Sequence, residues 1–129
     1  MELNLSVLRL ASQLATHSAA RQQVITENIA HADTPGYRAR DIAEFEDTLN
    51  ETMPHFSARQ TRPGHIAFGN PNPSFEPFEV TAFGAEGPNG NTVSLEDQMM
   101  RATHVQENHK LALGVYRKSL EILRTSIGR

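Results

Sequence analysis

Apolar residues recur at helical spacing along two long stretches, one at each end of the chain. In the first stretch, residues 3–32, two rows advance in alternating steps of four and three: positions 3, 7, 10, 14, 17, 21, 24 and 28, and positions 8, 11, 15, 18, 22, 25, 29 and 32. Two rows predict one long helix that contacts neighbours on more than one side, as in a multi-helix bundle. Its middle, with His17, Arg21 and Gln22, is too polar for a strong isolated coiled coil.

The second stretch, residues 95–127, carries one unbroken row of the same kind. The row comprises Leu95, Met99, Ala102, Gln106, His109, Leu113, Tyr116, Leu120, Leu123 and Ile127. Ser94, followed by an acid at Asp97, predicts an N-cap there. A helix over this range is about 50 Å long at ~1.5 Å per residue. That length exceeds what a domain of this size can bury, so we expect the helix to project or to pack along a partner.

The middle of the chain has a different composition. Residues 51–92 contain six of the seven prolines, and phenylalanines stand at positions 56, 68, 75, 78 and 83. The stretch Phe75–Phe83 has some strand character, but Pro77 limits it to a sheet edge. We expect an irregular segment with a possible small β hairpin, either anchored by its phenylalanines or ordered only on assembly. The predicted fold class is therefore mainly α: two long N- and C-terminal helices packed as a coiled-coil-like bundle, with divisions at residues 1–50, 51–92 and 93–129.

A sharp turn is predicted at Thr34-Pro35-Gly36-Tyr37. Proline fixes its own φ and disfavours the helical conformation at the residue before it. Glycine behind it supplies the positive φ of a type II turn. The first helix must therefore end near residues 32–33. Asn28, one turn earlier, is placed to hydrogen-bond a free backbone group with its amide.

Charge and composition narrow the function classes. A chain of 129 residues is one domain's worth of protein, and its mean hydropathy of −0.47 is typical of long exposed helices. The net charge is −3, and no basic stripe is present, which argues against nucleic-acid binding. Residues 1–50 carry −3 and residues 91–129 carry +2. This difference favours pairing of the two helices without driving it, because salt screens exposed charges beyond about 10 Å.

Catalytic, cofactor and metal chemistry finds little support in the sequence. The chain has no cysteine, and its histidines are scattered; His104 and His109 are five apart, which does not stack two ligands on one helix face. The acidic cluster Glu44, Glu46 and Asp47 is interpreted as a solvated helix face. We therefore expect no enzyme activity, no cofactor, no metal and no small-molecule substrate. The N-terminus lacks the features of a cleavable signal peptide, and no apolar run approaches the ~20 residues that span a bilayer.

The block from Thr26 to Tyr37 contains Asn28-Ile29-Ala30 and, after a short gap, Thr34-Pro35-Gly36-Tyr37. It resembles the N-terminal signature of the bacterial flagellar rod and hook proteins. The continuation through Asp41 and the segment from Gly90 to Asp97 are similar to the proximal-rod members of that family, as is, more weakly, the segment from Thr61 to His65. His31 stands where the family usually has an asparagine, so the contact made by that side chain is open.

The resemblance implies a structural subunit of the proximal rod of the flagellar basal body. Such a subunit belongs to the shaft that transmits motor torque to hook and filament, and it encloses the export channel. The implied partners are further copies of the chain, the rod protein FlgC, the adaptor FliE, the membrane ring protein FliF and the flagellar type III export apparatus. The implied location is the rod in the periplasmic space, reached without a cleaved signal peptide. Subunit contacts are expected through four residues in the strongly apolar C-terminal half of the row in residues 95–127: Leu113, Tyr116, Leu120 and Leu123.

Two other function classes stay open at this point. A cytosolic helical-hairpin adaptor or chaperone explains the apolar rows of both predicted helices and the lack of signal-peptide features. It does not explain the block ending in Thr34–Tyr37. A small metal-dependent enzyme has only scattered histidines in its favour.

Overall fold

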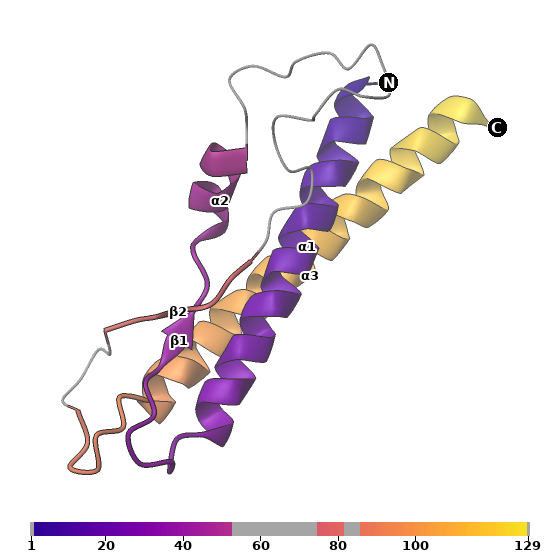
Figure 1. The fold of residues 1–129 in the computed structure, drawn as a ribbon. Helices are drawn as coiled ribbons and strands as arrows, with labels where there is room; N and C mark the ends of the chain where they lie inside the picture. The colour runs from indigo at the N-terminus through magenta and orange to yellow at the C-terminus, as the bar shows by residue number, and fades with distance from the viewer. Residues whose placement is uncertain (1, 53–74, 82–85, 129) are drawn as a thin grey trace.

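Two long helices dominate the structure, a computed structural model that describes residues 2–52, 75–81 and 86–128. Figure 1 shows their arrangement. In chain order the elements are α1 (Glu2–Ala30), β1 (Arg40–Asp41), α2 (Phe45–Thr52), β2 (Phe78–Glu79) and α3 (Leu95–Ile127). The fold is mainly helical, as predicted, and α1 packs against α3.

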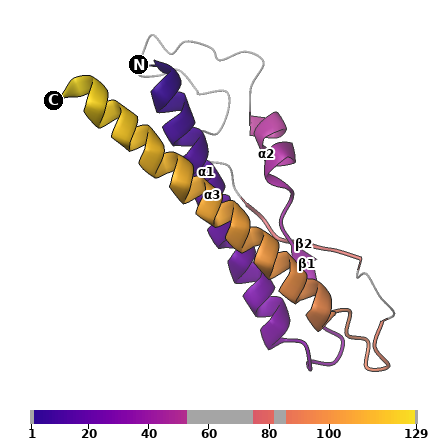
Figure 2. The same ribbon diagram turned by 180° about the vertical axis from the view of Figure 1, so that it is seen from behind.

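The two long helices are antiparallel. They lie side by side near the end formed by the loops around residues 31–39 and 86–93, and they diverge toward the end that carries both termini (Figures 1 and 2). The short helix α2 stands beside α1, on the other side from the free end of α3 (Figure 2). None of the described helices combines the length and apolarity needed to cross a membrane.

Both ends of α3 agree with the sequence. The Ser94 hydroxyl accepts a hydrogen bond from the Asp97 backbone N–H at 3.4 Å, and the Gly128 N–H donates to the Arg124 carbonyl at 2.9 Å. The first helix ends at Ala30, slightly before the expected stop, and residues 31–33 continue as turns. The predicted N-cap and both bounds of α3 are therefore confirmed.

The interface between α1 and α3 consists mainly of short side chains at seven-residue spacing. On α3 the buried residues are Gln98, Val105, Ala112 and Ser119; on α1 the same spacing gives Ala11, Ser18 and Ile25. A repeat of seven keeps one narrow face of a helix toward its partner, as in coiled coils. Small residues at these positions allow the two backbones to approach closely.

The apolar row predicted on the second helix is not the face that α3 buries against α1. Each buried residue of α3 comes directly before a member of that row, so that Ala112 is buried while Leu113 is 39% exposed. Met99 is 61% exposed and Leu120 39%. The short residues occupy the close interface because large ones would hold the helices apart. The large apolar side chains of α3 consequently remain on the outside of the helix pair.

The other row of α1 faces a different neighbour, which confirms the prediction of contacts on more than one side. His17, Arg21 and Asn28 are buried and bond to the segment of residues 40–44. The polar middle of α1 therefore anchors this segment along the helix.

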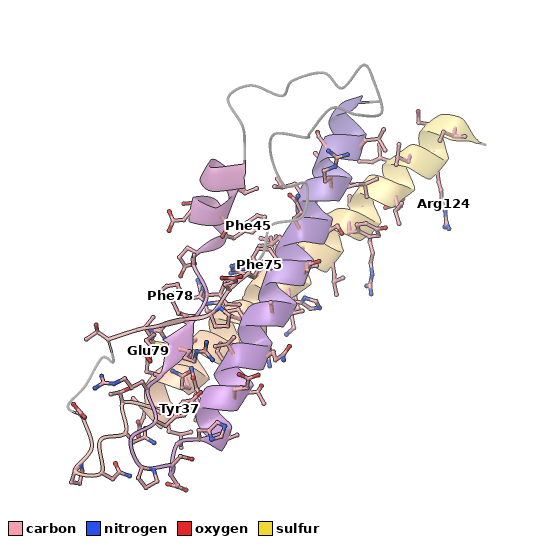
Figure 3. The ribbon with its side chains drawn as sticks, viewed as in Figure 1. Tyr37, Phe45, Phe75, Phe78, Glu79 and Arg124 are labelled. Carbon is pink, nitrogen blue, oxygen red and sulfur yellow. The ribbon has the colours of Figure 1, made fainter. Side chains whose placement is uncertain are left out.

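A two-stranded antiparallel sheet joins the middle of the chain to this segment. Arg40 pairs with Glu79 and Asp41 with Phe78, so the expected small β element is present, with its first strand coming from residues 40–41. The ring of Phe75 lies 5.0 Å from that of His17, whereas Phe78 is 49% exposed (Figure 3). Phe56, Phe68, Phe83 and the Thr61–His65 element lie outside the described residues. The division of the chain at residues 51–92 remains a prediction.

Candidate assembly site: a junction of two turns

The predicted turn follows α1 directly. Gly36 has φ +72°, and the Tyr37 N–H donates to the Thr34 carbonyl at 3.3 Å. Pro35 and Gly36 thus occupy the two central positions of a type II turn, as expected. Nothing lies within 4 Å of where a Cβ on Gly36 would stand, so the positive φ, rather than lack of space, is what favours glycine there.

A second turn, which leads into α3, packs against the first. Gly90 has φ +79°, and a Cβ added to it would lie 3.5 Å from the Gly36 Cα. The Gly36 N–H donates to the Asn89 carbonyl at 2.9 Å, and the Thr92 N–H donates to the Tyr37 carbonyl at 3.1 Å. We call residues 34–37 and 87–92 together the turn junction.

Asn91 ties this junction to the end of α1. Its side-chain amide donates to the carbonyls of His31, Ala32 and Thr34 at 2.8–2.9 Å, and its own oxygen accepts from the Val93 N–H at 2.8 Å. The last carbonyls around a helix C-terminus lack partners within the helix. A residue about sixty positions away, only 6% exposed, therefore binds the carbonyls that directly follow α1.

Asn28 holds the outgoing chain one turn earlier, as the sequence predicted. Its side chain is fully buried and pairs with both backbone groups of Arg40: Nδ2 donates to the carbonyl at 2.7 Å, and Oδ1 accepts from the N–H at 3.1 Å. The same amide donates to Gln98 Oε1 on α3 at 3.0 Å, and the Tyr37 hydroxyl donates to Oδ1 at 3.4 Å. A single amide thus joins α1, the turn and α3.

Asp41 is the centre of a buried ionic cluster beside the junction. Its carboxylate accepts from Arg21 Nε at 2.9 Å and Nη2 at 2.8 Å, from the Ile42 N–H at 2.8 Å, and from Arg101 Nη1. Arg21 also pairs with Glu44 at 2.9 Å, and Arg101 with Asp97 at 2.9 Å. The cluster connects α1, β1 and α3 through charge-assisted bonds, which are stronger than neutral ones.

In this cluster the effect of burial on the pKa values of Asp41 and Arg21 is outweighed by the hydrogen bonds and opposite charges. Burial alone would raise the pKa of Asp41, but the hydrogen bonds and charge of Arg21, with the Ile42 N–H and the charge of Arg101, lower it below its ordinary value. Burial would likewise lower the pKa of Arg21, yet its bonds to Asp41 and Glu44 raise it. Both groups are therefore held in their charged forms.

His17 completes the contact between α1 and the segment that follows the junction. Its Nε2 donates to the Ala43 carbonyl at 2.7 Å, and its ring lies 5.5 Å from that of Phe45 and 5.0 Å from that of Phe75. Figure 3 shows the two phenylalanines on the side of α1 that faces α2. This histidine is a packing and hydrogen-bonding residue of the fold.

The structure separates the predicted site residues into two groups. Asn28 and Tyr37 point into the junction, whereas Ile29, Ala30, Thr34, Pro35 and Gly36 lie at its exposed surface. The sequence left the contact of His31 open. Its ring stacks on that of Tyr37, with the ring centroids 4.6 Å apart, and its Nδ1 lies 3.2 Å from the Thr34 hydroxyl oxygen. Leu113, Tyr116 and Leu120 are each 39% exposed and Leu123 is half-buried; all four lie on α3 beyond the junction.

Sequence reasoning missed the residues that connect the site over long range. The sequence places Asn91 and Asp41 only within segments that resemble the rod family. It places Glu44 in an acidic cluster interpreted as a solvated face, although Glu44 pairs with Arg21. The available signal was the position of Arg21 in an otherwise core-facing row, which predicts a buried acidic partner. Among the described residues no group of three or more histidines and acids is placed to hold a metal ion.

Comparison with known proteins shows what the chain is similar to. No family model matches the chain. A protein of Agrobacterium fabrum is 26% identical over 109 residues, which is 83% of this chain and 81% of the relative. One of Cereibacter sphaeroides is 29% identical over 121 residues, 89% of this chain and 93% of the relative. One of Escherichia coli is 46% identical over 48 residues, 37% of this chain and 34% of the relative.

All three relatives bear the same description, flagellar basal body rod protein FlgB. The chain is similar to flagellar basal body rod proteins over most of its length. This similarity supports a component of the flagellar basal body rod, of the kind described as FlgB.

Proposed function

We propose that this rod component is a structural subunit of the proximal rod, in the shaft that carries motor torque toward hook and filament and encloses the export channel. Its neighbours in this proposal are further copies of itself, FlgC, FliE and FliF. The chain reaches the periplasmic rod through the flagellar type III export apparatus without a cleaved signal peptide. In this role it performs no catalysis.

One observation carries the proposal: α3 keeps its large apolar side chains outside the helix pair. Leu111 is 60% exposed, Ile122 47% and Ile127 72%, in addition to the exposed leucines of the predicted row. Extended apolar surfaces of this kind mark interaction sites. A subunit that packs α3 against neighbours in a shaft buries this surface, whereas an isolated protein leaves it in water.

The turn junction and the ionic cluster suit the same role. A shaft under torque requires that each subunit keep the angle between its two helices. Asn28, Asp41 and Asn91 fix that angle with buried hydrogen bonds at the end where the helices meet. The helices diverge toward the other end (Figure 1), where α3 also exposes apolar side chains that are free to engage neighbours: Leu120, Ile122 and Ile127.

The test is the location of the protein in the cell. A version with a short peptide tag is expressed at its natural level, and basal bodies are isolated from detergent-treated cells. The tagged chain is expected in the basal-body fraction, at the same level as the other rod proteins. Recovery only from the soluble cytosolic fraction would contradict the proposal and favour the helical-hairpin adaptor or chaperone.

A further inference from the structure

The two ends of α3 carry exposed apolar surfaces, each with one charged residue of opposite sign. We propose that the N-terminal end of α3 in one subunit docks against the C-terminal end of α3 in a second copy of the same chain, so that copies join head to tail. The inference rests on the proposed rod function, since it names the partner of a surface that this function requires to be covered.

The first surface, here the methionine patch, comprises Leu95, Glu96, Met99 and Met100. Its three apolar side chains are 47%, 61% and 68% exposed, in the order of the chain. Methionine is flexible and polarisable, and it adapts to the shape of a partner surface. Glu96 is exposed, and its carboxylate bonds to the Ser94 hydroxyl at 3.2 Å; no cation in the described part of the chain pairs with it.

The second surface, here the terminal hollow, lies where α3 has separated from α1. It is a hollow of about 460 Å³ lined by Leu120, Leu123, Arg124, Ile127 and Gly128. Its lining is apolar apart from Arg124. Figure 3 shows the Arg124 side chain extending from α3 clear of the other elements, and no acid in the described residues pairs with it.

Apolar character and charge match between these two surfaces. The methionine patch presents exposed flexible side chains, and the terminal hollow offers an apolar lining for them to contact. Each surface also has one exposed charge without an ionic partner among the described residues, Glu96 on the patch and Arg124 at the hollow. The apolar contact would supply affinity, and the charge pair would set the orientation.

The occupant is a second copy because each chain carries both halves of the contact at positions that it cannot join itself. Residues 95–127 form one continuous helix about 50 Å long at ~1.5 Å per residue, so its two ends never meet within a subunit. A contact between two different patches of identical chains is heterologous. Repeated, it gives a ring or an open filament rather than a closed dimer.

The charge pair provides a test with an internal control. Self-association of the purified full-length chain is measured by sedimentation velocity for the wild type, Glu96→Arg, Arg124→Glu and the double variant. Each single reversal is expected to weaken association about tenfold, because like charges then face each other. The double variant re-forms the pair with opposite polarity and is expected to recover most of the loss. Lys118→Glu makes the same change as Arg124→Glu outside the hollow and should leave association unchanged.

Loss of helix stability cannot imitate this result. Both reversals oppose the helix dipole, so the double variant carries both penalties, and a purely structural effect would make it the worst of the four. Far-UV circular dichroism of each variant checks the folding. A double variant that associates no better than the single ones would overturn the proposal.

Mixing two defective variants tests the head-to-tail geometry. Met99→Asp with Met100→Asp disables the methionine patch, and Leu120→Asp disables the terminal hollow. Each variant alone is expected to stay monomeric, whereas an equal mixture should form a dimer and nothing longer. No dimer in the mixture, or a wild-type chain that stays monomeric at every concentration, would overturn a second copy as the occupant. If the tagged wild type still fractionates with basal bodies, the proposed function survives that outcome; self-association without basal-body location would leave the inference and contradict the function.

Discussion

Single buried side chains determine where the loops of this protein meet its helices. Asp41 is the clearest case, because one carboxylate accepts bonds from α1, from its own strand and from α3. Two arginines that face the interior need its charge. Removing one partner of a buried ionic cluster lowers the free energy of unfolding by more than the intact cluster contributes to it. The reason is that the remaining buried charges are then left without an opposite charge.

Replacing Asp41 by Asn should therefore destabilise the protein by about 3–5 kcal/mol. The expected effect depends on pH with a definite sign. The folded-state pKa of Asp41 lies below its ordinary value, so its contribution is complete above the unfolded-state pKa of about 3.9 and is lost as the pH falls through the folded-state value. Urea unfolding followed by circular dichroism between neutral and strongly acid pH measures both effects.

The control for Asp41 is Asp47, a nearby carboxylate that takes no part in the ionic cluster. Asp47 lies on the exposed first turn of α2, so Asp47→Asn should change the free energy of unfolding little. In Asp41→Asn the acid loss of stability should be smaller than in the wild type. Equal pH dependence in the two proteins would show that Asp41 does not hold the cluster together.

Asn91 permits a sharper test at the same scale, because Asp has its shape without its donor. Asn91→Asp would turn a carboxylate oxygen toward the carbonyls of His31, Ala32 and Thr34, which now accept from Nδ2. Loss of these part-buried hydrogen bonds and the new charge beside the carbonyls should together cost about 1–3 kcal/mol. Asn89→Asp keeps the side-chain oxygen that accepts from the Asn91 N–H, so its unfolding free energy should stay close to that of the wild type. Similar losses in the two variants would contradict the capping role.

At the scale of elements, the sequence predicted the features that depend on neighbouring residues, namely the bounds of α3 and the turn after α1. The α3 bounds follow from Ser94 and the unbroken row behind it, and the turn follows from Pro35 and Gly36. The face that α3 turns toward α1 was not predictable from apolarity. The buried row consists of Gln98, Val105, Ala112 and Ser119; Ala112 and Ser119 are small enough for a close interface, while larger apolar residues such as Met99 and Leu120 stay outside.

The long-range members of the site were beyond reach for a related reason. Asn91 and Asp41 act on groups that come near them only after the helices have paired. Their sequence neighbourhoods indicate a turn and a charged strand, and nothing local distinguishes a solvated asparagine from one that caps a distant helix. Asn28 was predictable because its partner, Arg40, lies just across the turn that the sequence itself fixes.

The turn at Gly36 should matter for assembly more than for export. Gly36→Val forces a β-branched residue into φ +72°, where nothing crowds the side chain, so the expected cost of about 1–3 kcal/mol comes from backbone strain. The variant should be secreted yet give few complete basal bodies, as counted by electron microscopy.

Gly114→Val is the matched control for this turn. Gly114 lies within α3, also with nothing within 4 Å of the added Cβ, and it has no positive φ. Valine is tolerated in a helix at least as well as glycine, so assembly should be normal. Normal motility of Gly36→Val would show that the turn does not set the geometry of the subunit.

At the scale of the whole molecule, the helix pair is incomplete in itself. Its closed end is fixed by buried hydrogen bonds, while α3 exposes methionines near that end and leucines toward the open end. These exposed side chains therefore contribute little to the stability of the monomer and more to the stability of the assembled rod. A substitution on the outer row of α3 removes little burial in the monomer and much more wherever that row is covered by a neighbour.

Leu120→Ala exploits this difference. Leu120 is 39% exposed, so the isolated variant should unfold within about 1 kcal/mol of the wild type, well below the ~2–5 kcal/mol of a fully buried leucine. In the rod the covered side chain would carry that larger cost at every subunit, so rods should not form at normal expression. Leu123→Ala, at a half-buried position, should lose some monomer stability as well as rod formation.

Lys118→Ala is the control for the row, because Lys118 lies on another face of α3. Among the described residues its ammonium pairs only with Glu121, at 2.9 Å, and both side chains are exposed. Exposed pairs of this kind contribute about 0–1 kcal/mol, so this variant should assemble and swim normally. Monomer stability is measured by urea unfolding, and rod formation by counting basal bodies. If Lys118 proves critical and the two leucines silent, the subunit contact lies on the opposite face of α3, and Leu113, Tyr116, Leu120 and Leu123 do not form it.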